Sequence, residues 1–294
     1  MNVIVTGATG FIGRHVVAQL VARGHAVTVV IRDTAKFRQL PWANDVSVIE
    51  CDLHRDFCAL PGPGVLSDVL VHLAWPGLPN YRDYFHIERN LVADLHFLRA
   101  MIDGGIPRLI VAGTCLEYGM QFGPLYEDAD THPSTPYGFA KDALRKSLEM
   151  LQKIKPFTLQ WLRLFYLYGE GQNPQSLLAQ LDRAIDQGQA VFNMSAGDQL
   201  RDYLPVGEVA RNFVRLVENP ECCGVVNCSS GKPVSVRQLV EQRCRERNSD
   251  ITLNRSFYAY PDYEPLAFWG IAAKLERQIG LESAAHMIVH KVAS

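Results

Sequence analysis

The sequence begins with Val3-Ile4-Val5-Thr6-Gly7-Ala8-Thr9-Gly10-Phe11-Ile12-Gly13, which joins a short apolar run to a glycine-rich turn. The run has the composition of a buried parallel strand, and the residues after the turn place apolar side chains at helical spacing as far as Arg23. Gly7 permits a tight turn, Gly10 lets the backbone approach a phosphate, and Gly13 lets the helix pack closely on the strand. The free N–H groups at the start of such a helix attract anions, so the stretch predicts a pyrophosphate cradle for a dinucleotide.

The alternation of strand and helix continues over the first 165 residues. The expected strands are Asn2–Thr6, Ala26–Ile31, Val46–Glu50, Val69–Leu73, Leu109–Ala112 and Thr158–Leu164. This pattern predicts an α/β fold with a Rossmann-like, doubly wound parallel sheet. We expect residues 1–168 to form the dinucleotide-binding domain and residues 169–294 to form mainly a smaller C-terminal substrate lobe. Residues 206–228, a helix and one more strand, are expected to return to the first domain.

Composition excludes several classes of protein. The chain has 294 residues, is 48% hydrophobic and carries a net charge of −2, so disorder and binding to nucleic acid or anionic lipid are not expected. Its apolar runs are far shorter than the ~20 residues that span a bilayer. Met1-Asn2 leads straight into a strand, which gives no sign of a secretory leader. The seven cysteines are odd in number and scattered, which favours neither a disulfide framework nor a metal site and predicts a cytoplasmic location.

Several segments resemble motifs of the extended short-chain dehydrogenase/reductase family, which contains sugar-nucleotide epimerases, dehydratases and reductases. These segments are Thr6–Gly13, Asp52-Leu53, His72-Leu73-Ala74, Asn90, Arg163–Gly169 and Gly197–Tyr203. The resemblance implies a nucleotide-sugar substrate and a nicotinamide cofactor. The implied cofactor-binding residues are Gly7, Thr9, Gly10, Phe11, Ile12, Gly13, Asp52, Leu53, Leu73, Ala74, Asn90, Lys141 and Leu164.

The end of the second strand bears on the choice of cofactor. An acidic residue there would bind a free ribose 2′-hydroxyl and repel a 2′-phosphate. Family register places Ile31 at that position and Arg32 beside it, and an arginine can pair with a phosphate. NADP(H) is therefore the favoured cofactor. NAD(H) is the alternative, because Asp33 follows closely and Arg32 could be a solvated loop residue.

Tyr137 and Lys141 form a Y-x-x-x-K motif, which places both side chains on one helix face. A lysine ammonium and a positively charged nicotinamide would both lower the pKa of the phenol toward the working range. Family position adds Thr114, at the end of the fifth strand, as a hydroxyl that binds the reacting sugar oxygen. The alternatives are a tyrosine packed beside a solvated lysine and a threonine that caps a turn.

Departures from the family motifs narrow the reaction. Cys115-Leu116 stands where sugar-nucleotide dehydratases carry an Asp-Glu pair, so dehydration is not expected; Cys115 itself is interpreted as a packing residue. Tyr166 replaces an asparagine common in 4-epimerases. The resulting hypothesis is an NADP(H)-dependent reductase of the 4-keto group of a nucleotide-linked 6-deoxyhexose. The alternatives are an NAD-dependent sugar-nucleotide 4-epimerase and a non-catalytic NADP-sensing protein. Substrate contacts are expected from Thr114, Glu117, Tyr166 and Arg201.

Two helices, residues 90–103 and 137–155, are predicted to carry a second apolar set besides the residues that face the sheet. The set comprises Leu91, Leu95, Leu98, Leu144, Leu148 and Leu151. Members of the family pair these helices with their symmetry mates, which predicts a homodimer. The alternative is that these leucines face the protein's own sheet.

Overall fold

The computed structural model describes residues 1–55 and 67–279, and its centre is a parallel sheet of seven strands. The strands are β1 (Asn2–Thr6), β2 (Ala26–Ile31), β3 (Ser47–Glu50), β4 (Val69–His72), β5 (Arg108–Thr114), β7 (Thr158–Leu164) and β12 (Gly224–Cys228). Their order is β12-β7-β5-β4-β1-β2-β3, and all adjacent pairs are parallel. The order reverses beside β1, which is where ligands bind in sheets of this kind. The predicted Rossmann-like α/β fold is confirmed.

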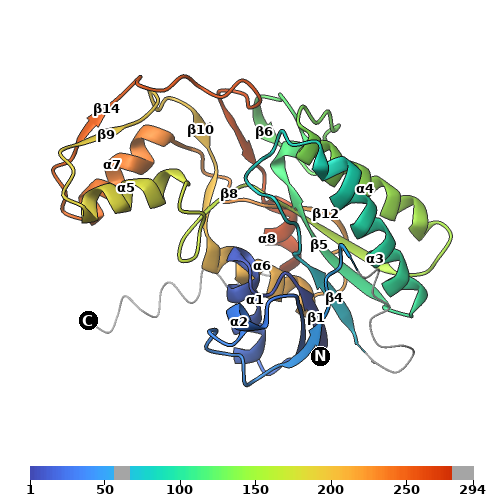
Figure 1. The fold of residues 1–294 in the computed structure, drawn as a ribbon. Coiled ribbons are helices and arrows are strands. Elements are labelled where there is room, and N and C mark those ends of the chain that lie inside the picture. Colours follow the sequence, from blue (N-terminus) through green and yellow to red (C-terminus); the bar gives the residue numbers. More distant parts are fainter. Residues whose placement is uncertain (56–66, 280–294) are drawn as a thin grey trace.

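Helices cover both faces of this sheet (Figure 1). On one face, α1 (Phe11–Ala22) and α6 (Val206–Glu218) pack against side chains such as Val3 and Val5. On the other face, α3 (Val92–Asp103) and α4 (Pro136–Gln152) cover Ile4 and its neighbours. Successive residues of β1 thus enter opposite cores, because side chains alternate along a strand. This double burial explains why the strands read as continuous apolar runs.

The second half of the chain builds a smaller lobe beyond the carboxyl edge of the sheet, seen at upper left in Figure 1. Its helices are α5 (Leu177–Asp186) and α7 (Val236–Glu246), which share a core of their own. Its short strands pair as β8 (Tyr166–Tyr168) with β11 (Tyr203–Pro205), β9 (Val191–Asn193) with β14 (Thr252–Asn254), and β10 (Leu200–Arg201) with β13 (Val234–Ser235). Residues 206–228, as α6 and β12, pack on the main sheet.

Six further short elements complete the described chain. They are α2 (Thr34–Phe37), a π-helical turn η1 (His86–Leu91), a 3-10 turn η2 (Cys115–Glu117), and β6 (Gly123–Leu125) paired with β15 (Phe268–Gly270), which leads to α8 (Ala273–Ile279). The β6–β15 pair ties the end of the chain to the segment that follows β5. It therefore brings residues near 264 to the edge of the sheet where ligands are expected.

Three of the leucines expected at a dimer surface lie elsewhere. Leu98, Leu144 and Leu148 are fully buried in the core between α3, α4 and the sheet. Leu91, Leu95 and Leu151 pack against the same core. The prediction of a second apolar face is wrong for Leu98, Leu144 and Leu148, because they are buried inside the subunit; Leu91, Leu95 and Leu151 are only partly buried, and for them it stays a prediction.

Within residues 1–55 and 67–279, no helix is long and apolar enough to cross a membrane. In the same part of the chain, no group of three or more acidic, histidine or cysteine side chains is arranged to hold a metal ion. Cys115, Cys222, Cys228 and Cys244 are buried thiols, and Cys223 is an exposed one. Cys51 is buried. Cys58 lies outside the described residues.

Candidate active site

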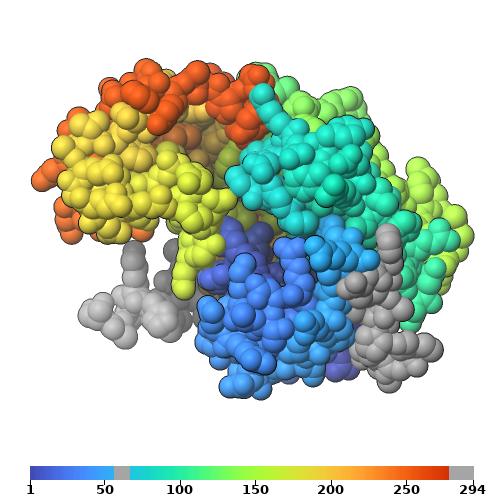
Figure 2. Space-filling view, viewed as in Figure 1, coloured from blue at the N-terminus to red at the C-terminus, as the bar shows by residue number. Residues whose placement is uncertain are grey.

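A cavity of about 840 Å³ lies at the carboxyl edge of the sheet, between the sheet and the smaller lobe. Figure 2 shows the molecule hollowed between the yellow and orange lobe and the blue N-terminal part. The lining comes from the β1–α1 turn, the ends of β2, β4, β5 and β7, and the segment around residues 171–178. A volume of this size accommodates a cofactor or a large substrate.

The glycine-rich turn forms the floor of the cavity. Gly7 has φ +69°, and a Cβ there would lie 2.6 Å from the amide nitrogen of Ala74. A Cβ on Gly13 would lie 2.1 Å from the carbonyl oxygen of Gly7, so neither position tolerates a side chain. Gly10 is the N-cap of α1, and no side chain caps the amides of the first turn. These amides are available to a pyrophosphate, and the residues present fit a dinucleotide.

Most of the predicted cofactor residues meet in this cavity. The lining includes Gly7, Thr9, Gly10, Phe11, Ile12, Gly13, Arg32, Asp52, Leu53, Leu73, Ala74 and Leu164. Asn90 is not among them. It is almost fully buried, and its side-chain amide donates a 2.9 Å hydrogen bond to the carbonyl oxygen of Pro76. The structure thus places Asn90 behind the segment that follows β4, where it holds the cavity wall.

At the end of β2, the cationic side chain of Arg32 lines the cavity, whereas the carboxylate of Asp33 binds the start of α2. Arg32 is exposed and lines the cavity, whereas Ile31 is buried. Asp33 caps α2 by accepting a hydrogen bond of 3.1 Å from the amide of Lys36. Because its carboxylate serves the helix, Asp33 is not directed at a ribose in the cavity.

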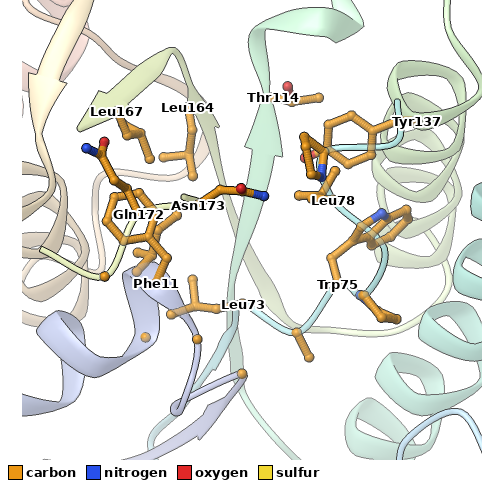
Figure 3. A pocket seen from close by; sticks show the side chains of 18 of the residues that line it. Phe11, Leu73, Trp75, Leu78, Thr114, Tyr137, Leu164, Leu167, Gln172 and Asn173 are labelled. Atoms are coloured by element: carbon orange, nitrogen blue, oxygen red, sulfur yellow. The ribbon is translucent and has the colours of Figure 1, made fainter. Parts of the chain in front are cut away.

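Thr114 and Tyr137 meet at the other end of the cavity (Figure 3). Both side chains line it, both are more than nine-tenths buried, and the Thr114 hydroxyl acts on the Tyr137 phenol as a hydrogen-bonding group that lowers its pKa. Thr114 also caps the turn η2, since its hydroxyl accepts a 3.3 Å hydrogen bond from the amide of Leu116. The capping interpretation of Thr114 is confirmed, and the functional one stays a prediction for a residue that also lines the cavity.

The environment of Tyr137 differs from the expectation. Its ring packs among aromatic side chains, with ring-centre distances of 5.6 Å to Tyr81 and 5.9 Å to Trp75. Burial raises the pKa of the Tyr137 phenol well above its usual range, and the hydrogen bond with Thr114 opposes that shift only in part. The protein's own residues therefore do not produce the expected lowering of the Tyr137 pKa.

Lys141 is buried rather than solvated. It is 2% exposed, and its ammonium nitrogen lies 3.8 Å from the ring centre of Trp75, which lines the cavity. Burial lowers the pKa of Lys141 to about 8, although Asp94 and Glu117 favour the charged form. The indole thus stands at the cavity wall over the ammonium. Sequence reasoning missed Trp75, whose only signal is its position directly after the His72-Leu73-Ala74 motif.

Glu117 does not reach the cavity. Its carboxylate is fully buried and accepts hydrogen bonds of 2.8 Å from the backbone amide of Thr114 and 2.8 Å from the guanidinium of Arg163. The indole N–H of Trp161 donates to the same carboxylate at 2.9 Å. The expected substrate contact is therefore wrong. Glu117 instead fixes the backbone of Thr114 at the end of β5.

Arg201 also differs from its expected position. It is 2% exposed and is not part of the cavity lining, whereas Tyr166 and Glu264 are. The guanidinium donates to the Tyr166 hydroxyl at 3.2 Å and to the Glu264 carboxylate at 3.0 Å. It also donates to the carbonyl oxygens of Leu200 and Leu266. These bonds occupy most of its donors, so the structure does not present Arg201 as an open phosphate ligand.

Comparison with known proteins extends this geometry. Residues 3–228 match the model of the NAD dependent epimerase/dehydratase family. The chain is 31% identical to a dTDP-6-deoxy-L-talose 4-dehydrogenase (NAD(+)) of Aggregatibacter actinomycetemcomitans, over 92% of this chain and 99% of that protein. It is 28% identical to a UDP-glucose 4-epimerase of Corynebacterium glutamicum, over 84% and 80% of the two chains.

A solved structure is similar over nearly the whole length. The structure of MoeE5 in complex with UDP-glucuronic acid and NAD superposes with a TM-score of 0.80 at 25% identity, covering 95% of this chain and 93% of that one. The family match covers the elements that carry the glycine cradle, Thr114 at the end of β5 and Tyr137 at the start of α4. With the cavity where such enzymes hold their ligands, the chain belongs to the NAD dependent epimerase/dehydratase family of nucleotide-sugar enzymes.

Proposed function

We propose that this protein is a reductase of the 4-keto group of a nucleotide-linked 6-deoxyhexose. The observation that carries the proposal is the pair of buried hydroxyl groups of Thr114 and Tyr137, which lines one cavity together with the glycine cradle. The relative that acts as a dTDP-6-deoxy-L-talose 4-dehydrogenase supports both the position on the sugar and the 6-deoxy class. A dehydrogenase and a reductase run the same step in opposite directions.

The side chains divide the work as follows. The cofactor, when bound, supplies the hydride that adds to C4. Tyr137 gives its phenolic proton to the oxygen on that carbon, and Thr114 orients the oxygen through its hydroxyl. One ketone, one hydride and one proton yield one alcohol. Water elimination would need a further acid and base, and Cys115-Leu116 offers none at the positions after Thr114.

We infer a preference for NADP(H). Arg32 at the cavity edge can pair with a 2′-phosphate, and Asp33 is engaged at the start of α2 and does not oppose it. NAD(H) is the alternative, because one similar protein is an NAD(+) dehydrogenase and one similar solved structure contains NAD. The ratio of KM values for NADPH and NADH measures this preference.

A 4-epimerase is the second candidate function, because several relatives are UDP-glucose 4-epimerases. An epimerase returns the hydride to the same carbon and keeps its NAD⁺ bound throughout. The experiment that separates the two is analysis of the nucleotide that remains after purification and dialysis, followed by assay with a dTDP-4-keto-6-deoxyhexose. A reductase oxidises NADPH in proportion to substrate. Retained NAD⁺ with no net oxidation of NADPH favours the epimerase, and binding of NADPH without turnover favours a non-catalytic sensor.

We further propose a homodimer through α3 and α4, now with different contact residues. Three large apolar side chains on these helices remain exposed, namely Val92, Phe139 and Met150. Pairing two copies about a twofold axis would cover them, since such an interface joins the same patch on both subunits.

A further inference from the structure

The segment between β14 and β15 brings a carboxylate to the catalytic end of the cavity. Tyr263 and Glu264, from this segment, both line the cavity. The Tyr263 ring centre lies 6.1 Å from that of Tyr81, and Tyr81 lies 5.6 Å from Tyr137. A row of three aromatic rings thus connects the catalytic phenol to the residue next to Glu264.

An ion pair with Arg201, on the side away from the cavity, holds the Glu264 side chain in place. Its carboxylate accepts a 3.0 Å hydrogen bond from Arg201, and the two side chains are 9% and 3% exposed. The Tyr166 hydroxyl accepts a hydrogen bond from Arg201 at 3.2 Å, and Glu264 raises the pKa of the Tyr166 phenol. Glu264 lines the cavity and Arg201 does not, so the negative member of the pair is the one that a ligand meets.

The lining of the cavity exposes Glu264 rather than its partner. Arg201 pairs with the carboxylate from outside the cavity, and among the described residues that line the cavity, the one arginine is Arg32, at the end of β2. Glu264 raises the pKa of the buried Cys115 thiol and of the Tyr166 phenol more than Arg201 lowers them, whereas at Tyr203 the effect of Arg201 is the larger one. A ligand at the catalytic end therefore meets the carboxylate of Glu264 directly and the guanidinium of Arg201 only behind it.

We propose that Glu264 is a specificity residue that admits neutral hexoses and excludes uronic acids. The inference rests on the proposed function, because it assumes that a nucleotide sugar places C4 near Thr114 and Tyr137. The carboxylate carbon of a uronic acid is C6, which is two carbons away from C4. It would therefore lie close to the negative charge of Glu264. A methyl group or a hydroxyl at the same carbon is not repelled, and sugar hydroxyls can donate hydrogen bonds to the carboxylate.

Calorimetric titration of matched nucleotide sugars tests this. The protein, saturated with NADP⁺, is titrated with UDP-glucose and UDP-glucuronic acid, and then with the corresponding dTDP pair. We expect the wild type to bind the neutral sugar at least about tenfold more tightly, since like charges a few ångströms apart in a partly dry site repel strongly. Glu264→Gln should reduce that ratio at least about fivefold. Asp262→Asn is the matched control, because its carboxylate lies two residues away and is largely solvent-exposed; it should leave the ratio unchanged.

The outcomes separate the two proposals. If Glu264→Gln keeps the wild-type ratio while binding both sugars, the role of Glu264 is overturned and the proposed function stands. If the wild type binds neither pair, the proposed function fails and this inference fails with it. If Glu264→Gln does not fold because Arg201 loses its counter-charge, the double variant Arg201→Gln/Glu264→Gln removes both charges. The double variant should bind both sugars with the reduced ratio, and a retained wild-type ratio would again overturn the proposal.

Discussion

Replacing Lys141 by methionine should stabilise the protein at neutral pH while abolishing the proposed reductase activity. The ammonium is 2% exposed, and burial lowers the pKa of Lys141 from 10.5 to about 8. At about 1.4 kcal/mol per pKa unit, keeping this charge at pH 7 costs about 3 kcal/mol of folding free energy. The contact with Trp75 offsets about 1–2 kcal/mol of that cost. Methionine fills a similar volume without a charge, so a net gain of about 1–2 kcal/mol is expected.

The pH dependence distinguishes this explanation from a simple packing effect. A lysine with a lowered pKa in the folded state imposes its full penalty below pH 8, where it is charged in both states. The penalty fades as pH rises from 8 to 10.5, because the folded protein loses the proton first. Urea denaturation of cofactor-free protein at pH 7 and pH 10 should therefore show the advantage of Lys141→Met at pH 7 and little at pH 10. Lys153→Met, at an exposed position just after α4, should change neither value. A less stable Lys141→Met protein at pH 7, or an advantage that persists at pH 10, would refute the reasoning.

Four other substitutions test separate parts of the structure. Tyr137→Phe should lower kcat by ~10²–10⁴-fold with little change in NADPH binding, measured by fluorescence titration, because it removes proton transfer and little surface; a near-normal rate would exclude Tyr137 from the chemistry. Arg32→Ala should raise the Kd for NADPH roughly tenfold or more and that for NADH much less, and equal effects would place Arg32 outside the site. Glu117→Ala should lower stability by about 3–5 kcal/mol in urea denaturation, because it leaves the Arg163 guanidinium buried without its counter-charge; an unchanged midpoint would contradict that. By light scattering, the wild type should have about twice the chain mass of 32.9 kDa and Phe139→Glu should be a monomer, whereas a monomeric wild type would contradict the dimer.

The sheet could be predicted because its signal is local. The bounds of β1, β2 and β7 match the expected strands to the residue, since burial on both faces leaves runs that are mostly apolar. The start of the helical segment before α3 could not be predicted. The chain turns helical at His86, four residues before the expected Asn90, and the indole of Trp75 donates a 3.0 Å hydrogen bond to His86. This boundary depends on a contact between segments that are separate in the sequence, so the spacing of apolar residues does not predict it.

The candidate site, too, could be predicted only in part from the sequence. The glycine cradle and the pair of Thr114 and Tyr137 were predictable, because fixed positions at the ends of strands and at the start of a helix bring them to one edge of the sheet. The positions of Lys141, Arg201 and Glu117 were not. Each depends on a partner that is distant in the sequence, such as Glu264 for Arg201, and spacing along the chain does not reveal which charge a second charge will meet.

The buried phenol of Tyr137 favours one direction of the proposed reaction at neutral pH. Burial raises its pKa, and the nearby Tyr81 and Glu117 raise it further, so the phenol is neutral in the protein alone. A neutral phenol is ready to give a proton to the oxygen on a sugar carbon, which is what reduction requires. Oxidation requires the phenolate as proton acceptor, and the positive charge of an oxidised nicotinamide is what a bound cofactor would supply to favour it. Reduction needs no such help, and this is the physical ground for proposing a reductase where a relative is named a dehydrogenase.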